Sequence, residues 1–170
     1  PVLDDTDSPT YEYLTKEDVD TIAQDNEQTS RYLYSLWNNF CISTYYEPGS
    51  TAKPFTMAAA LESGSLTGDG WEIKCHNTDG DGMLTLNQAI ERSCNVVLMD
   101  MALATGEETF CKFQRIFNFG LKTNIDLAKE VRTDGLIYSA DKMVDVDLAT
   151  NSFGQNFDVT MIQMITGFSS

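Results

Sequence analysis

The chain contains 170 residues, of which 42% are apolar, 22% charged and 11% aromatic, and this composition excludes a wholly disordered, collagenous or low-complexity chain. Eleven basic against 26 acidic side chains give a formal net charge of -15, which repels phosphates and argues against a nucleic-acid partner. The longest uninterrupted apolar run, Met57 to Leu61, is too short to span a membrane. The length suits one domain or a piece of one. We expect an excised piece, because no leader precedes Pro1 and no stop signal follows the last apolar segment.

The N-terminal part is predicted to be acidic and then helical. The first thirty residues carry nine acidic side chains and one basic side chain, Lys16. We assign residues 1–14 to an acidic lead-in and residues 15–170 to a helical core. Thr15 is a candidate N-cap for a helix that ends near Asn39. A short β-prone stretch, Ile42 to Tyr46, follows that helix.

The rest of the chain predicts short apolar helices separated by turns. A buried helix is expected over Phe55 to Leu61, ending at Gly64, and a loop rich in Gly and Asp follows it. Thr85 and Gln88 match a capping box. Further helices are expected over about 85–90, 96–104, 107–120 and 160–165, with a loop or short strand over 121–130.

Ser50 and Lys53 are the first candidates for chemistry. A step of three residues at a helix start places a hydroxyl and an amine on one face. Pro54 fixes that start close to Ser50, because its ring excludes a regular helical carbonyl four residues earlier. A serine hydroxyl needs a neighbouring base to become nucleophilic, and a lysine desolvated against an apolar helix has the lowered pKa that such a base requires.

The same spacing recurs at Ser139 and Lys142, so the spacing alone is a weak signal. The first pair follows a Pro-Gly turn and opens the apolar helix. The second pair lies in polar sequence beside Asp141 and Asp145. We therefore assign the second pair to exposed surface.

A second motif, Ser93-Cys94-Asn95, lies between two apolar helical segments and on its own predicts an interhelical turn with an Asn cap. With their flanks, the two motifs resemble the transpeptidase domain of class B penicillin-binding proteins. The resemblance covers about residues 36–167. It rests on YEPGSTAKPFT at residues 46–56, SCN at 93–95, FNFGLKTNIDL at 117–127 and SFGQ at 152–155.

The resemblance implies an α+β fold of the β-lactamase/transpeptidase type, with a helical cluster beside an α/β sandwich. This chain is expected to hold mostly the helical part, with the main sheet incomplete. The implied activity is that of a peptidoglycan D,D-transpeptidase, whose serine is acylated by the D-Ala-D-Ala end of a stem peptide or by a β-lactam. By position, Ser50 is the nucleophile and Lys53 takes its proton. Ser93 relays a proton toward the leaving amine, Asn95 binds the substrate amide, and Cys94 is a spacer.

The sequence departs from the family in its third motif. Lys-Thr-Gly and Lys-Ser-Gly are both missing from the chain. Lys122-Thr123-Asn124 precedes the SFGQ stretch, whereas the family motif follows it, so this tripeptide is not that motif. In the family, the missing strand binds the substrate carboxylate and supplies one of two oxyanion donors, the other being the amide of Ser50. We expect a domain truncated before this motif, with weak activity of its own. The stretch over 64–71 is shorter than the resemblance implies, and whether residues were removed there stays open.

Three alternatives follow from the same residues. A β-lactamase or β-lactam sensor of the same fold is disfavoured by the flank EPGSTAKPFT. A calcium-binding module is suggested by Asn77 to Gln88, which has oxygen side chains at loop positions 1, 3 and 5 and Gly at position 6. That loop has Asn at position 1 and Gln rather than Glu at position 12. A non-catalytic scaffold piece is the third alternative.

No metal or cofactor is expected. The single histidine, His76, lies in a polar loop and predicts a solvated side chain, which disfavours hydrolases that need histidine. Cys41, Cys75, Cys94 and Cys111 lack the CxxC spacing of a zinc site. The four cysteines can be buried thiols or can form two disulfides, and we favour buried thiols.

The partners follow from the resemblance alone. Peptidoglycan stem peptides and β-lactam antibiotics are the expected ligands. The parent protein is expected to be anchored at the extracytoplasmic face of the bacterial cell membrane, in a cell-wall synthesis complex. This chain is expected to be a soluble fragment that self-associates through the helix surface that an absent sheet leaves uncovered.

Overall fold

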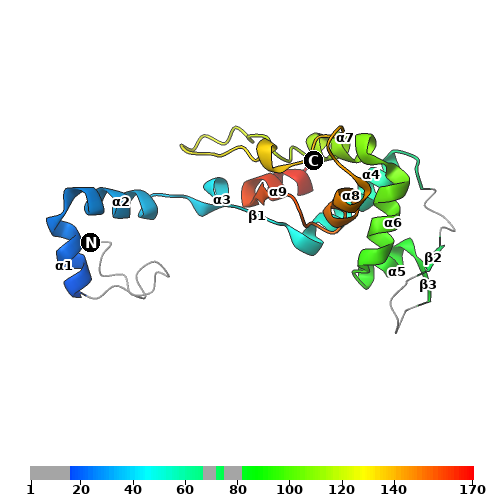
Figure 1. Cartoon of the computed structure of the whole chain (residues 1–170), viewed down its shortest axis with the longest axis horizontal. Helices are drawn as coiled ribbons and strands as arrows, with labels where there is room; N and C mark the ends of the chain where they lie inside the picture. Colours follow the sequence, from blue (N-terminus) through cyan, green and yellow to red (C-terminus); the bar gives the residue numbers. More distant parts are fainter. Residues whose placement is uncertain (1–15, 67–71, 75–81) are drawn as a thin grey trace. The chain divides into compact units, whose positions relative to one another are not determined.

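The computed structural model describes residues 16–66, 72–74 and 82–170, and the chain divides into two compact units, Pro1–Phe40 and Cys41–Ser170 (Figure 1). The first unit holds α1 (Lys16–Gln24) and α2 (Asn26–Leu36). Between them, the Asp25 carboxylate accepts the backbone N–H of Glu27 at 2.8 Å. This bond ends one helix and starts the next. The prediction of a single helix up to Asn39 is therefore wrong.

The second unit is mostly helical and carries two small antiparallel sheets, which makes the architecture α+β. Its elements are α3 (Phe40–Ser43, from the last residue of the first unit), β1 (Tyr45–Tyr46), the 3₁₀ helix η1 (Gly49–Ala52), α4 (Lys53–Glu62), β2 (Glu72–Lys74), β3 (Met83–Thr85), α5 (Leu86–Glu91), α6 (Asn95–Thr105), α7 (Glu107–Ile116), the 3₁₀ helix η2 (Asp134–Leu136), α8 (Asp145–Asn151), β4 (Val159–Thr160) and α9 (Met161–Phe168).

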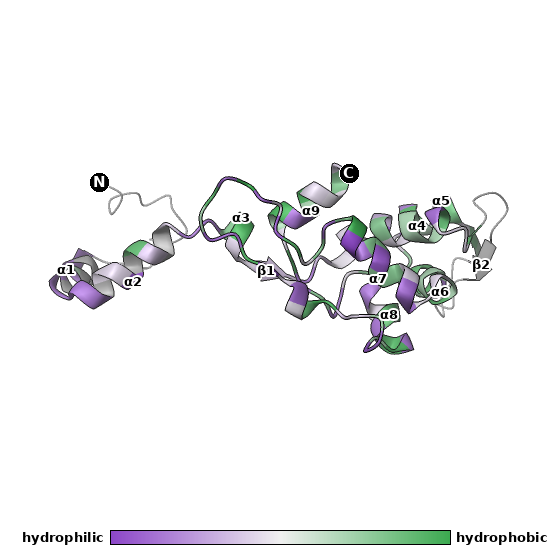
Figure 2. Ribbon diagram, turned by 90° about the horizontal axis from the view of Figure 1, so that it is seen from above, coloured by the Kyte–Doolittle hydropathy of each residue, from purple (hydrophilic) through white to green (hydrophobic). Residues whose placement is uncertain are grey.

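Helix α4 is central to the packing of this unit. It contacts both α6 and α7, and α6 in turn contacts α8. Ala59 and Ala60 are small residues buried on α4, and they allow the neighbouring helices to approach closely. Hydrophobic colouring runs along most of α4, whereas α1 is mostly hydrophilic (Figure 2). The sequence correctly predicts α4 as a buried apolar helix.

The buried apolar side chains form three clusters. The first lies between α4, α5 and α6 and includes Leu84, Leu98 and Met101. The second lies under η1 and the start of α4, where Phe55 packs against Phe119 with ring centroids 4.9 Å apart. The third joins α6, α7 and α8. The second cluster supports the turn on which Ser50 lies.

The two sheets tie distant parts of the sequence together. Strand β1 pairs with β4, with Tyr45 opposite Thr160 and Tyr46 opposite Val159, and β2 pairs with β3. The β-prone stretch from Ile42 is only partly a strand, because Ile42 itself is buried in α3. Strand β1 leads the chain directly toward η1.

The local helix signals are mostly confirmed. Thr85 and Gln88 form the predicted capping box at the start of α5. The helix expected to reach Gly120 ends at Ile116, because Asn118 takes a left-handed conformation with φ of 65°. Residues 121–130 are a loop. Strand β2 and helix α8 are not predicted from the sequence.

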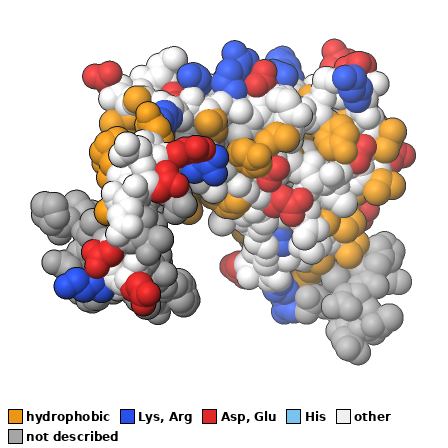
Figure 3. All heavy atoms as spheres, turned by 60° about the vertical axis from the view of Figure 1, so that its left-hand side comes forward, with side chains coloured by type: hydrophobic (Ala, Val, Ile, Leu, Met, Phe, Trp, Pro, Cys, Tyr) orange, Lys and Arg blue, Asp and Glu red, His pale blue; other side chains and the backbone are white. Residues whose placement is uncertain are grey.

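No helix in the described part of the chain combines the length and the hydrophobicity that a membrane span requires. On the face drawn in Figure 3, hydrophobic side chains lie in separate groups among acidic and basic ones. The most exposed large apolar side chains of α9 are Ile165 and Phe168, at 61% and 58%.

Candidate active site

Ser50 lies in a tight turn at the start of the central helix. Gly49 begins η1 with φ of 56°, a left-handed conformation that favours glycine. The backbone N–H of Lys53 donates to the carbonyl of Ser50, which closes one 3₁₀ turn between the two residues. Pro54 occupies the first turn of α4, as the sequence predicts. Ser50 is exposed, whereas Lys53 is only 3% exposed.

Ser93 reaches this turn from the connection between α5 and α6. Its backbone has φ of 52°, and its N–H donates to the carbonyl of Ile90 at 2.9 Å. The next N–H, of Cys94, donates to the carbonyl of Ala89 at 2.9 Å. These bonds fix the connection on the end of α5. Forty-three residues separate Ser93 from Ser50 in the sequence.

The three side chains form one hydrogen-bonded network. The Lys53 Nζ donates to the Oγ of Ser93 at 2.6 Å and to the carbonyl of Ser93 at 2.6 Å. The Ser93 Oγ donates to the Oγ of Ser50 at 3.3 Å. The sequence places Ser50 and Lys53 on one helix face, and the structure adds Ser93 as the group that bridges them.

Burial changes the acid-base properties of Lys53. Desolvation lowers the pKa of Lys53 from its ordinary value of 10.5, because an ammonium is disfavoured away from water, while Cys94 acts in the opposite direction. A lysine with a lowered pKa carries a larger fraction of neutral amine at a given pH. This is the state that can accept a proton from a hydroxyl.

The remaining candidates divide into those near the network and those elsewhere. Asn95 is the exposed first residue of α6, two residues after Ser93. The half-buried Cys94 packs against the first hydrophobic cluster. The second Ser-x-x-Lys pair lies in a turn before α8, where the N–H of Lys142 donates to the carbonyl of Ser139 and the Lys142 side chain is exposed. Only the first pair combines a buried lysine with a serine partner.

Sequence reasoning missed the residues that hold the Ser50 turn from outside. The N–H of Gly49 donates to the carbonyl of Gly154 at 2.8 Å, and the Thr56 hydroxyl donates to the carbonyl of Ser152 at 2.8 Å. Both acceptors belong to the SFGQ stretch, which the sequence singles out without giving it a role. Contacts over about a hundred residues leave no periodic signal in the sequence.

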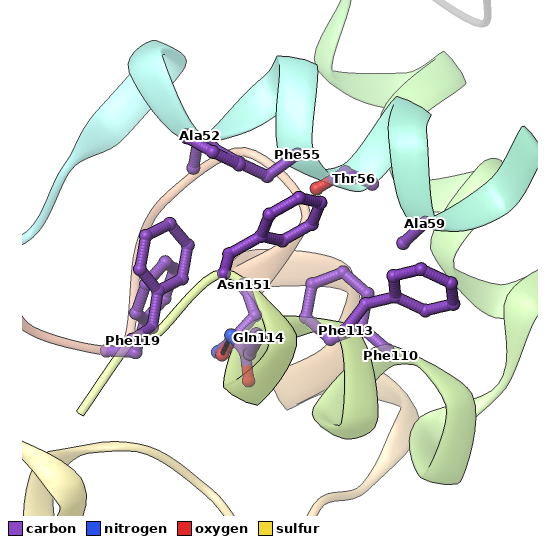
Figure 4. A pocket seen from close by; sticks show the side chains of 11 residues that line it. Ala52, Phe55, Thr56, Ala59, Phe110, Phe113, Gln114, Phe119 and Asn151 are labelled. Carbon is purple, nitrogen blue, oxygen red and sulfur yellow. Dashed lines mark hydrogen bonds between the residues drawn. The ribbon is translucent and has the colours of Figure 1, made fainter. Parts of the chain in front are cut away.

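A cavity of about 10 Å³ lies beneath α4, lined mainly by phenylalanine rings with Thr56, Gln114 and Asn151 (Figure 4). Gln114 Nε2 donates to Asn151 Oδ1 at 3.3 Å, and Gln114 Oε1 is the one buried side-chain oxygen or nitrogen without a partner in the described part of the chain. The cavity is too small for a peptide. The exposed network at Ser50 is therefore the better candidate for substrate chemistry.

The described residues include some, but not all, of those named in the metal and cysteine predictions. Within residues 16–66, 72–74 and 82–170, no group of three His, Cys, Asp or Glu side chains is arranged to hold a metal ion. His76, Cys75 and the first part of the calcium-like loop, residues 77–81, lie outside the described residues. Among the described cysteines, Cys41, Cys94 and Cys111 form no disulfide with one another.

Comparison with known proteins identifies relatives. Stage V sporulation protein D of Bacillus subtilis is 33% identical over 150 residues, which cover 80% of this chain and 23% of that protein. Peptidoglycan D,D-transpeptidase FtsI of Escherichia coli is 31% identical over 137 residues, which cover 74% of this chain and 23% of that protein. The chain therefore spans about a quarter of the length of these curated relatives.

Solved structures show the same fold. The transpeptidase domain of penicillin-binding protein 3 from Burkholderia pseudomallei matches with a TM-score of 0.68 at 20% identity, over 78% of this chain and 43% of that one. A peptidoglycan glycosyltransferase from Burkholderia ambifaria matches with a TM-score of 0.69 at 21% identity, over 80% of this chain and 46% of that one. The predicted α+β fold class is confirmed.

The family model of the penicillin-binding protein transpeptidase domain matches residues 8–170. That match spans nearly the whole chain and includes both sequence motifs and the elements that carry them. It agrees with the resemblance read from the residues, and the β-lactamase and calcium-module alternatives are not favoured. The chain belongs to the penicillin-binding protein transpeptidase domain family.

Proposed function

We propose that this chain is the acylation half of a serine D,D-transpeptidase that cross-links peptidoglycan, with Ser50 as nucleophile. The observation that carries the proposal is the hydrogen-bonded network of Lys53, Ser93 and Ser50, in which a buried lysine reaches an exposed serine through a second hydroxyl. A family member with this network has the groups that acyl transfer requires. They are a nucleophile, a base and a proton relay.

The chemistry follows from the geometry. The Ser50 Oγ attacks the carbonyl carbon between the two D-Ala residues of a stem peptide, and its proton passes through the Ser93 hydroxyl to neutral Lys53. The C–N bond then breaks, and the same proton returns through Ser93 to the departing D-Ala amine. An amine of a second stem peptide attacks the resulting ester, which forms the cross-link and restores the Ser50 hydroxyl. A β-lactam undergoes only the acylation step, so its opened ring stays bound to the Ser50 Oγ as an ester.

Asn95 is proposed to bind the substrate. It begins α6 two residues after Ser93 and is exposed, so its amide group is available to a peptide lying along the network. An amide donates and accepts at once, which matches the backbone of a stem peptide. The partners proposed here are stem peptides and β-lactams. The proposed location is the extracytoplasmic face of the bacterial cell membrane, within a cell-wall synthesis complex.

Labelling with a fluorescent penicillin tests the assignment. We expect one covalent adduct, which peptide mapping by mass spectrometry places on Ser50, and we expect its loss in Ser50→Ala. The chain offers a matched control, because Ser139→Ala and Lys142→Ala change the second copy of the same spacing and are expected to leave labelling unchanged. A label on Ser139 or Ser93, or one that survives Ser50→Ala, contradicts the proposal.

A further inference from the structure

The turn that carries Ser50 is held by a segment about a hundred residues further along the chain. Besides the bond from Gly49 N–H to the Gly154 carbonyl at 2.8 Å, the backbone N–H of Asn156 donates to Glu47 Oε1 at 2.8 Å. Glu47 and Gly49 both lie within three residues of Ser50. Two hydrogen bonds therefore tie residues 154–156 to the chain immediately before the nucleophile.

The contact at Gly154 leaves no room for a side chain. Gly154 has φ of 85°, and a Cβ placed there would lie 2.0 Å from the carbonyl oxygen of Gly49 and 2.6 Å from its nitrogen. Carbon and oxygen atoms that are not bonded stay more than 3 Å apart, and here both neighbours are backbone, which cannot rotate away. Any side chain at residue 154 must displace Gly49, the residue bonded to Ser50.

Asn156 connects residues 154–156 to helix α8. It takes a left-handed conformation with φ of 64°, and its Nδ2 donates to Asp147 Oδ1 at 2.8 Å. Asp147 belongs to α8, which packs against α6, and α6 begins directly after the connection that presents Ser93. Residues 154–156 are therefore held against α8 and, through it, α6. They thus couple the position of Ser50 to that of Ser93, its hydrogen-bond partner.

We infer that Gly154, assisted by Asn156, is a positioning residue that sets the distance between Ser50 and Ser93. The inference rests on the proposed function, because it concerns the acylation of Ser50. The Ser50–Ser93 bond is the longest of the network at 3.3 Å, so a displaced turn lengthens it beyond hydrogen-bonding range. A misplacement of about 1 Å lowers the rate of a positioned reaction about 10²-fold.

The test compares Gly154→Ala with Gly106→Ala in the full natural protein. Gly106 has φ of 79°, and a Cβ there meets no atom within 4 Å. Both variants therefore place alanine at a positive φ, but only one displaces Gly49. We expect the acylation rate constant at saturating penicillin to fall about 10- to 100-fold in Gly154→Ala and less than about 2-fold in Gly106→Ala. The dissociation constant of the non-covalent complex should change little in either. Equal rate constants in the two variants overturn the inference.

A milder pair of variants covers the case in which Gly154→Ala does not fold. Glu47→Ala removes the acceptor for the Asn156 N–H, while Glu47→Gln keeps an Oε1 acceptor at the same place. We expect slower acylation in Glu47→Ala and recovery of most of the rate in Glu47→Gln. A structural role alone predicts a change in melting temperature without this split between acylation rate and affinity, and that result overturns the inference.

Hydrogen exchange separates this inference from the proposed function. If the unaltered protein reacts with no penicillin, the proposed function is wrong, and the positioning contact remains testable by exchange of the Gly49 amide. That amide should exchange at least about tenfold faster in Gly154→Ala than in Gly106→Ala, because it loses its acceptor only in the first. Equal exchange rates in the two variants show that Gly154 does not hold the turn.

Discussion

Lys53 is the residue on which the proposed chemistry depends most. Its side chain is almost fully buried, and both of its hydrogen bonds to Ser93 use its Nζ as donor. An ammonium has three N–H groups, whereas a neutral amine has two and a lone pair, so the amine can keep its bond to the Ser93 carbonyl while the lone pair accepts from the Ser93 hydroxyl. Burial thus favours the state that can act as a base, and in that state only the bond between Nζ and the Ser93 Oγ changes direction.

Replacing Lys53 by arginine separates charge from basicity. A guanidinium stays protonated and cannot accept the Ser50 proton, although it keeps the positive charge. We expect Lys53→Arg to lose penicillin acylation nearly as completely as Lys53→Ala, in a stopped-flow or quenched labelling assay. Near-normal acylation by Lys53→Arg would show that Lys53 acts only as an electrostatic anchor.

The pH dependence of acylation follows from the direction of the Lys53 pKa shift. Burial lowers the pKa of Lys53 below 10.5. The inactive ammonium therefore predominates below that lowered pKa, and the amine forms as the pH rises through it. We expect the acylation rate constant at saturating penicillin to rise with pH along one ionisation and to level off below 10.5. Lys142→Ala should give the same profile, whereas a rate constant that does not vary with pH contradicts the role of Lys53 as base.

At the scale of elements, short-range signals predict more than long-range ones. The capping box at Thr85, the apolar run of α4 and the proline after Lys53 are local, and each predicts its element correctly. Strand β2 is three residues long and is specified by its pairing with β3, so no periodicity marks it in the sequence. Helix α8 begins with the Val144 N–H donating to Asp147 Oδ2, a cap whose residue types also suit a polar turn.

The contacts of the candidate site also divide into a short-range one, which the sequence predicts, and long-range ones, which it does not. Ser50 and Lys53 are three residues apart, so the sequence predicts that one helical turn holds both of them, whereas their link through the Ser93 hydroxyl does not follow from that spacing. The role of Ser93 in the network needs the packing of α6 against α4. The contact between Gly49 and Gly154 depends on the whole second unit, and neither residue type nor spacing predicts it.

The aromatic cluster beneath η1 makes a prediction about stability. Phe55 is 7% exposed and lies within 4.9 Å, centroid to centroid, of both Phe117 and Phe119. We expect Phe55→Ala to lower the free energy of unfolding by about 3–5 kcal/mol, measured by urea denaturation. Ile165→Ala, on an exposed side chain of α9, should change it by less than about 1 kcal/mol. Similar losses in both variants would mean that this cluster does not support the turn that carries Ser50.

At the scale of the whole molecule, the 170-residue sequence holds two of the three motifs that the proposed reaction uses. It contains the Ser-x-x-Lys and Ser-x-Asn motifs and neither Lys-Thr-Gly nor Lys-Ser-Gly. The network joins Ser50 of η1, Lys53 at the start of α4 and Ser93 in the connection between α5 and α6, and no strand contributes a side chain to its hydrogen bonds. The proposed roles therefore predict that reactive geometry and transition-state stabilisation are separable.

Acylation rates test that separation. We expect the 170-residue chain to react with penicillin about 10²- to 10³-fold more slowly than a transpeptidase domain that carries all three motifs, because one oxyanion donor is missing. The comparison uses second-order rate constants under identical conditions. Equal rate constants would mean that the third motif is dispensable or is present in an unrecognised form.

At Ser93, the backbone conformation favours glycine, whereas the proposed chemistry requires a hydroxyl. A non-glycine residue in this conformation costs roughly 1–2 kcal/mol, yet the hydroxyl that bridges Lys53 and Ser50 requires a side chain there. Ser93→Gly relieves the backbone strain and Ser93→Ala keeps it, while both remove the hydroxyl. We expect the glycine variant to be more stable than the alanine variant by about 1 kcal/mol, and both to lose most acylation. A more stable glycine variant would show that the backbone conformation of residue 93 lowers the stability of the fold, whereas equal stabilities would show that the surrounding structure tolerates it without cost.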